Sequence, residues 1–155
     1  MNIGFYLLNI DGNNPYQTTI LRSIDELCKL RPYDNIVLFN DRTNTVHHSL
    51  GHYILHINEA KYFKGKLFVF DPESLVLTKD FPAPSKQILV INEAHWAKDK
   101  AKPYGLWKSI YESANVELVT MNKDLKSLCS ICWKDPLMSI SGISGEQFNN
   151  VLQEL

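Results

Sequence analysis

The sequence predicts an α/β fold in which helices cover both faces of a mainly parallel sheet of about six or seven strands. The first observation is a repeated unit, a short apolar run that ends in Asn or Asp and is followed by a loop or a helix start. The second is that helical patterns separate many of these runs, which favours crossovers between parallel strands. The clearest copies of the unit are Ile3–Asn9, Ile36–Asn40, Leu67–Asp71, Ile88–Asn92 and Val116–Asn122.

The first half of the chain opens with an expected strand over Ile3–Leu8. Its apolar residues fall on both faces, which is typical of a central parallel strand. Asn14 before Pro15, with Gln17 three positions after Asn14, predicts a capped helix start. Pro32 ends this helix. Further strands are expected at Asn35–Phe39, Tyr53–Ile57 and Leu67–Phe70.

In the second half, Pro72 opens a short helix, and the segment Asn92–Lys102 has no periodicity and is expected to be a loop. Pro103 begins the next helix, and Asn122 and Ser144 are the expected N-caps of the last two. Strands are expected at Ile88–Ile91, Val116–Met121 and Leu137–Ile140. Together these elements predict a single domain over residues 1–155, a Rossmann-like three-layer α/β sandwich.

The length and charge of the chain exclude some functions. At 155 residues and 45% hydrophobic, the chain has the size of one ordinary domain. Sixteen basic and seventeen acidic residues nearly cancel, so the chain lacks the positive field of a nucleic-acid binder. A local patch at Lys98, Lys100, Lys102 and Lys108 is expected to be a solvated loop and helix face. No nucleic-acid partner is therefore expected.

Cysteine usage and hydropathy bear on location. Three cysteines and no cationic-then-apolar leader indicate an intracellular, reducing environment. No apolar run approaches the ~18 residues of a membrane helix, so no membrane partner is expected. The expected location is the cytoplasm. If the composition, rich in Asn, Lys, Ile and Tyr, reflects a phage, that means the host cytoplasm or a virion.

Polar side chains follow several of the predicted strands. Because the carboxyl ends of parallel strands meet at one edge of a sheet, these side chains are expected to converge on a hydroxyl-rich ligand. Asn and Asp also end strands and cap helices for purely local reasons, and this alternative stays open. The expected ligand-binding residues are Asn9, Gly12, Asn13, Asp41, Arg42, Glu73, Asn92 and Trp96.

Three residues at the same edge are candidates for acid–base chemistry. Glu93 and His95 are two positions apart and precede a flat aromatic, Trp96, so they can form a base, its orienting partner and a stacking platform. Asp11, in the loop after the first strand, is the third candidate. The alternative is that His95 and Trp96 simply cover the edge of the sheet.

Several other kinds of site are not expected. The loop after the first strand has one glycine, Gly12, where phosphate-cradling loops need two or three, so no nucleotide cofactor is expected there. Gly51 and a strand-like segment interrupt the histidine cluster, and no Asp or Cys completes a tetrahedral set, so no metal is expected. The histidines concerned are His47, His48, His52 and His56.

At the level of motifs, the chain resembles a family. The run Asn2–Leu7, the loop Asp11–Asn13 and the long capped helix resemble the start of the N-terminal, acceptor-side domain of two-domain (GT-B type) glycosyltransferases. The Asn92–Trp96 loop, the helix led by Asn122 and the passage from Ile140 to Phe148 resemble later parts of the same half.

The resemblance implies that Gly12 allows close approach of the sugar or its acceptor. It also implies that Asp11, Glu93 or His95 activates the acceptor hydroxyl. The family's nucleotide-sugar site lies mainly in the C-terminal half, and this chain ends where that half would begin.

The leading hypothesis is therefore a stand-alone glycosyltransferase-like acceptor domain that acts as a binding or accessory module for a glycan or nucleotide sugar. We do not expect catalysis by this half alone, and a transferase reaction would need a second domain or partner. The alternative is a phage or bacterial structural or interaction protein. In that case apolar residues such as Trp96, Tyr104, Trp107 or Trp133 contact a protein partner or a second copy. A small independent enzyme, such as a hydrolase or a flavodoxin-like domain, is a third hypothesis.

Overall fold

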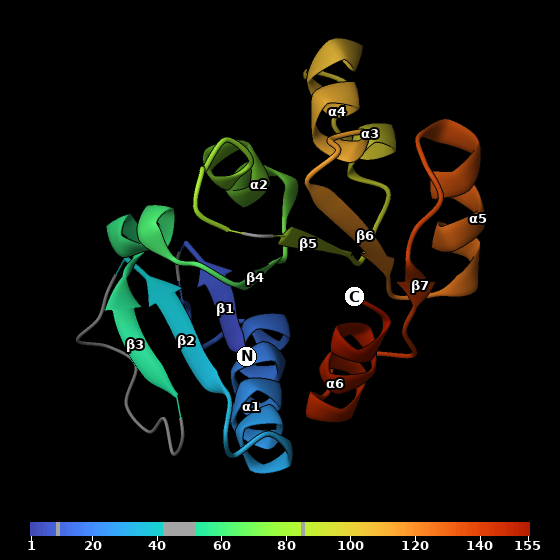
Figure 1. The fold of residues 1–155 in the computed structure, drawn as a ribbon. Helices are drawn as coiled ribbons and strands as arrows, with labels where there is room; N and C mark the ends of the chain where they lie inside the picture. The colour runs from blue at the N-terminus through green and yellow to red at the C-terminus, as the bar shows by residue number, and fades with distance from the viewer. Residues whose placement is uncertain (9, 42–51, 85) are drawn as a thin grey trace.

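The computed structural model describes residues 1–8, 10–41, 52–84 and 86–155. Within this part of the chain, seven strands form one sheet in the order β3-β2-β1-β4-β5-β6-β7, and every neighbouring pair is parallel. The predicted Rossmann-like α/β fold is confirmed (Figure 1). The strands are β1 (Asn2–Leu7), β2 (Asn35–Asn40), β3 (Tyr53–His56), β4 (Lys66–Val69), β5 (Lys86–Ile91), β6 (Val116–Thr120) and β7 (Met138–Ser139).

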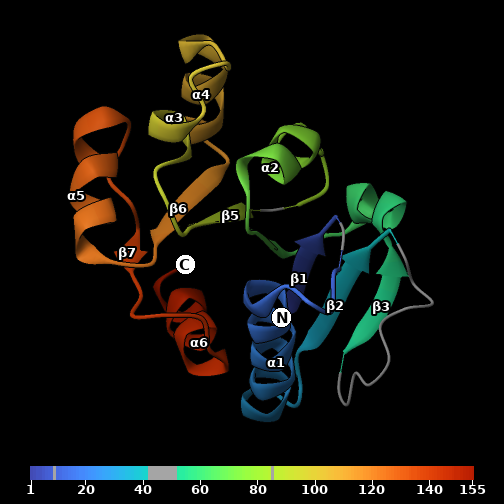
Figure 2. The same cartoon turned by 180° about the vertical axis from the view of Figure 1, so that it is seen from behind.

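Helices form a layer on each side of this sheet. α1 (Pro15–Leu30) and α6 (Gly145–Glu154) lie on one side, and the remaining helices lie on the other, as Figures 1 and 2 show from opposite directions. None of the described helices is both long and apolar enough to cross a lipid bilayer. The helices of the second layer are η1 (Ile57–Tyr62), α2 (Pro72–Thr78), α3 (His95–Lys98), α4 (Tyr104–Tyr111) and α5 (Lys123–Cys132).

Two hydrophobic cores follow from the two layers. Under α1 and α6, Phe5 stacks on Phe68 with ring centroids 5.0 Å apart, and Phe148 of α6 packs 5.1 Å from Phe68. On the opposite face, Trp107 and Tyr111 of α4 pack over the sheet. Because both faces are covered, the central strands carry apolar residues at consecutive positions, as parallel strands do.

The start of α1 agrees with the predicted cap and adds one contact. The side chain of Asn14 accepts hydrogen bonds from the backbone N–H groups of Tyr16 at 3.0 Å and Gln17 at 3.3 Å. The side chain of Gln17 accepts a hydrogen bond from the N–H of Asp11 at 2.6 Å. Gln17 therefore also anchors the loop that precedes the helix.

The other predicted caps are confirmed by the hydrogen bonds they make. Asn122 Oδ1 accepts from the N–H of Leu125 at 2.8 Å at the start of α5. Ser144 Oγ accepts from the N–H of Gln147 at 3.2 Å at the start of α6. Each bond satisfies one of the N–H groups that the first turn of a helix leaves without a backbone partner.

The structure corrects the predicted loop over Asn92–Lys102, which contains the four-residue helix α3. The N–H groups of Ala97 and Lys98 both donate to the carbonyl of Ala94, at 3.0 and 3.3 Å. No side chain caps this helix, and a single turn is too short to show a helical period in the sequence. The 3₁₀ helix η1 was likewise not predicted.

Helices α1 and α6 are in close contact, although they are far apart in the sequence. The N–H of Gly145 donates to the carboxylate of Glu26 at 3.0 Å. A Cβ added at Gly145 would lie 2.6 Å from the backbone nitrogen of Leu27 and 2.6 Å from Cβ of Glu26. Only glycine therefore fits at this crossing without moving the backbone of α1.

Between β1 and β4 the direction in which successive strands are added to the sheet reverses, while all strands stay parallel. From β1 the chain proceeds outward through β2 to β3, then crosses back and continues from β4 outward to β7. In open α/β sheets, ligands bind outside the carboxyl ends of strands at such a switch point. A ligand site is therefore expected among the loops that follow β1, β4 and β5.

Replacing Gly145 by Ala is expected to lower the free energy of unfolding by about 1–3 kcal/mol, because the new methyl group meets the backbone of α1. Gly105→Ala is the matched control: it is also in the first turns of a helix, and a Cβ there meets nothing within 4 Å. Denaturant unfolding of both variants checks the prediction. Equal stability of the two variants would contradict it.

Candidate functional site

Asp71 stands at the centre of the carboxyl edge, directly after β4. Its carboxylate caps α2 by accepting hydrogen bonds from the N–H and the hydroxyl of Ser74, both at 2.7 Å. Burial raises the pKa of Tyr6 in β1 and of Tyr16 in α1, and the nearby carboxylate of Asp71 raises both further. Asp71 therefore lies beside the switch point, close to β1 and to the start of α1.

A cavity of about 280 Å³ opens next to Asp71. Its walls come from the start of α2, from α3 and from the segment that leads into α4. It combines three carboxylates, one histidine, one lysine and one tryptophan. The residues that line it are Asp71, Pro72, Glu73, His95, Asp99, Lys102 and Trp107.

His95, the first residue of α3, is held by two residues of the loop that precedes it. Its Nδ1 lies 3.2 Å from Oε1 of Glu93, and its Nε2 lies 3.2 Å from Oδ1 of Asn92. Glu93 also pairs with Lys98, one turn further along the chain. The imidazole is thus fixed in orientation by an acid and an amide, with a quarter of its side chain (24%) exposed.

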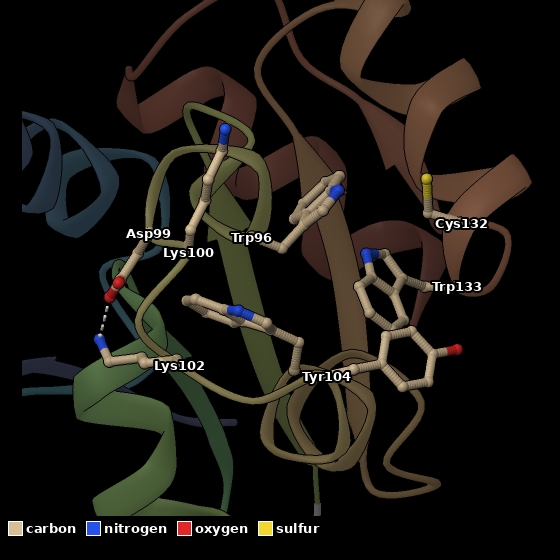
Figure 3. A pocket seen from close by; sticks show the side chains of 8 residues that line it. Trp96, Asp99, Lys100, Lys102, Tyr104, Cys132 and Trp133 are labelled. Atoms are coloured by element: carbon tan, nitrogen blue, oxygen red, sulfur yellow. Dashed lines mark ion pairs between the residues drawn. The ribbon is translucent and has the colours of Figure 1, made fainter.

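Lys102 forms ion pairs with residues on both sides of the cavity. Its ammonium lies 3.0 Å from the carboxylate of Glu73 in α2 and 3.0 Å from that of Asp99, the latter pair drawn in Figure 3. It also lies 5.4 Å from the ring centre of Trp107, within cation–π range. One cation thereby joins the first turn of α2 to the segment between α3 and α4.

The charges of the site act on one another. Burial lowers the pKa of His95, while the carboxylates of Glu93 and Asp71 oppose part of that shift. The hydrogen bond from Lys98 lowers the pKa of Glu93. Hydrogen bonds to Glu73 and Asp99 raise the pKa of Lys102. Near neutral pH the site therefore holds an uncharged imidazole among ionised carboxylates and ammonium groups.

This arrangement suits a ligand rich in hydroxyl groups. Carboxylates accept hydrogen bonds from hydroxyls, and the ammonium of Lys102 donates to them. A neutral imidazole carries one proton, which it donates either to Glu93 or to Asn92. Because both ring nitrogens face these two residues, a bound hydroxyl reaches the lone pair of the neutral ring by displacing the amide of Asn92 from Nε2. The ring can then accept the proton of that hydroxyl.

The structure brings five of the predicted site residues into one region. Glu73 and His95 line the cavity. Asn92 and Glu93 contact the imidazole of His95 from the same loop. Trp96 lines a neighbouring cavity that shares Asp99, Lys102 and Trp107 with this one.

In its described residues, the loop after β1 does not contribute to either cavity. Asp11, Gly12 and Asn13 line neither of the two cavities. The N–H of Asn13 donates to Oδ1 of Asp11 at 2.9 Å, which stabilises the turn locally. A Cβ at Gly12 would meet nothing within 4 Å, so the fold itself does not require glycine there.

Of the remaining predicted residues, only Asp41, directly after β2, lies within the described residues. Asp41 is half-buried, and its Oδ1 has no hydrogen-bond partner among the described residues. Asn9 and Arg42 lie outside the described residues, as do His47 and His48. Across the described ranges, no group of three or more His, Cys, Asp or Glu side chains is arranged to hold a metal ion.

Asp99, Lys102 and Trp107 are parts of the site that the sequence did not indicate. Lys102 was expected to be a solvated lysine, and Trp107 was named as an apolar residue that could contact a protein partner or a second copy. The one available signal was the charged run ahead of Pro103, with Asp99 among lysines just before a helix start. A charged run of that kind is usually a solvated loop. Only the folded structure, which brings this run next to α2, shows that it belongs to the site.

Comparisons with protein-family models, with curated proteins and with solved structures found no match to this chain.

Replacing Glu93 by Gln is expected to lower the pKa of His95 further, because the carboxylate that opposes the effect of burial is lost. Lys98→Gln is expected to raise that pKa, because the ammonium of Lys98 disfavours the imidazolium. An NMR titration of the histidine rings measures both shifts. The spectrum of His95→Gln identifies the relevant signal among the five histidines.

The lowered pKa of His95 makes the free energy of unfolding depend on pH. Since the folded protein disfavours the charged ring of His95, the unfolded chain takes up the proton first as the pH falls below about 6.5. The free energy of unfolding is therefore expected to fall with pH from there down to the lowered pKa, and more steeply in Glu93→Gln. A pKa of His95 in Glu93→Gln that equals or exceeds that of the unaltered protein would contradict the assignment.

Proposed function

We propose that this chain is a carbohydrate-binding module, comparable to the acceptor-side half of a two-domain glycosyltransferase, and that the cavity beside Asp71 and His95 is its binding site. The observation that carries the proposal is the convergence of Glu73, His95 and Lys102 on one cavity at the carboxyl edge of a doubly wound sheet. Its volume of about 280 Å³ is near the lower end for small-molecule sites.

The composition of the cavity favours a sugar over an apolar ligand. Three carboxylates and an ammonium offer both acceptors and a donor for hydroxyl groups, and Trp107 adds apolar surface to the lining. Lys102 is already neutralised by Glu73 and Asp99, so the site has no surplus of positive charge for a phosphate. A neutral, hydroxyl-rich ligand fits this balance.

His95 and Glu93 give the site a further capability. A neutral imidazole oriented by a carboxylate can accept the proton of an acceptor hydroxyl when that hydroxyl attacks an activated sugar. The donor of such a sugar would bind in a second half, supplied by another domain or partner. We therefore place the function of this chain in acceptor binding, with transfer dependent on that second half.

Thermal unfolding across a panel of simple glycans, nucleotide sugars and free nucleotides tests the proposal. A glycan at one hundred times its dissociation constant is expected to add about 2.7 kcal/mol to the free energy of unfolding. His95→Gln and Asp71→Asn are expected to abolish the shift. Asn retains the ability to cap α2, so Asp71→Asn removes the charge and keeps the helix start.

Gly12→Ala is the control for this experiment, because Gly12 lies outside both cavities. The variant is expected to keep the full shift. Loss of the shift in Gly12→Ala alone would move the site to the loop after β1. The absence of any shift up to millimolar glycan would refute the proposal.

A second function is favoured by a separate observation on the surface of α4 and α5. Two large side chains there are strongly exposed, Tyr104 at 65% and Ile131 at 82%. In that case the protein acts as an interaction protein, with this surface covered by a protein partner or by a second copy. The two proposed functions predict different effects of substitutions in the cavity and on the surface of α4 and α5.

Light scattering after size-exclusion chromatography measures self-association directly. If the surface of α5 mediates it, a dimer is expected at high protein concentration, and Ile131→Asp is expected to convert it to a monomer. His95→Gln is expected to leave the dimer unchanged. A protein that stays monomeric at all concentrations would rule out self-association.

A further inference from the structure

A second cavity, of about 410 Å³, has walls made mainly of aromatic rings. It lies in the second helical layer, between α3, the start of α4 and the end of α5. Figure 3 shows the rings of Trp96, Tyr104 and Trp133 around it, and Trp107 forms a further wall. The three tryptophans are all those that the chain contains.

The rings are held in place by one another and by a buried tyrosine. Trp96 and Trp133 meet edge to face with centroids 5.9 Å apart, and Tyr104 stacks on Trp133 at 5.4 Å. Behind them, Tyr111 is fully buried and contacts Trp96 at 4.9 Å and Trp133 at 5.4 Å. The walls are therefore rigid and preorganised for a flat ring.

One charged group at this cavity has no ion-pair partner among the described residues. Lys100 lines the cavity, and no described carboxylate pairs with it. The other two charged residues of the lining, Lys102 and Asp99, are paired with each other. The unpaired charge at the cavity is therefore the positive charge of Lys100.

We propose that this cavity binds a flat aromatic or heteroaromatic ring that carries an anionic group. The ring packs against the aromatic walls, and the anionic group pairs with Lys100. A cationic ligand is disfavoured, because Lys102 and Asp99 neutralise each other and the ammonium of Lys100 borders the cavity without a partner. The inference does not rest on the proposed glycan binding, although the two cavities share Asp99, Lys102 and Trp107.

Tryptophan fluorescence tests the inference directly, since every tryptophan of the chain borders this cavity. The probes are adenosine 5′-monophosphate with its parts, adenosine and ribose 5-phosphate, and benzoate with its neutral counterpart benzyl alcohol. At least one anionic ring is expected to quench saturably and to bind about tenfold more tightly than its neutral counterpart. Ribose 5-phosphate, which has no flat ring, is expected to have no effect. Which anionic ring binds more tightly distinguishes a nucleotide from an aromatic carboxylate.

Two variants separate the ring from the charge. Lys100→Gln alters an exposed side chain and is expected to bring the affinity for the anionic ring down to that for the neutral one. Lys108→Gln is the matched control, because Lys108 is exposed on α4 and does not line the cavity. Trp133→Phe keeps a ring but makes this aromatic wall smaller, and is expected to weaken binding of both members of a pair.

The inference is overturned by any of three results. The first is no saturable quenching by either anionic ring up to 10 mM, about the weakest affinity a specific site would show. The second is equal affinity for the anionic and neutral members of each pair. The third is unchanged affinity for the anionic ring in Lys100→Gln.

Discussion

Parallel pairing is the constraint on which the rest of this structure depends. Each strand of a parallel sheet must be reached by a crossover, and the crossovers cover the faces of the sheet with helices. In the described part of the chain all seven strands pair in this way. The central strands therefore need apolar residues on both sides, and the loops after them are all brought to the same edge.

The two helical layers contribute differently to this arrangement. The first layer is closed by α6, which returns the end of the chain to α1 and packs Phe148 against Phe5 and Phe68. Gly145 makes that return possible, because its missing side chain lets the start of α6 touch the backbone of α1. Both cavities lie in the second layer.

The two cavities differ in chemistry because they draw on different parts of the same loops. Carboxylates at the starts of helices and the loop histidine dominate the cavity beside Asp71, while tryptophans from three segments dominate the other. Lys102 and Trp107 belong to both walls. The ion pairs of Lys102 with Glu73 and Asp99 are therefore part of the charge balance of both cavities.

The sequence by itself determined the local features. The caps at Asn14, Asn122 and Ser144 were predictable because each depends on a side chain within three residues of the groups it satisfies. The strand positions were predictable because runs buried on both faces are apolar throughout. The pairing of Glu93 with His95 was also foreseeable, since the two residues share one short loop.

Only the tertiary structure decided which of these parts meet. The contact between Lys102 and Glu73 joins residues 29 positions apart, and no local pattern specifies it. Strand order places the loops after β4 and β5 side by side, and leaves Asp11 and Gly12 outside both cavities. Likewise, Trp96, Tyr104 and Trp133 come from separate elements that each carry only an ordinary apolar pattern. The physical reason is that backbone capping and burial act over a few residues, whereas a site is assembled by crossovers whose arrangement depends on the packing of the whole sheet.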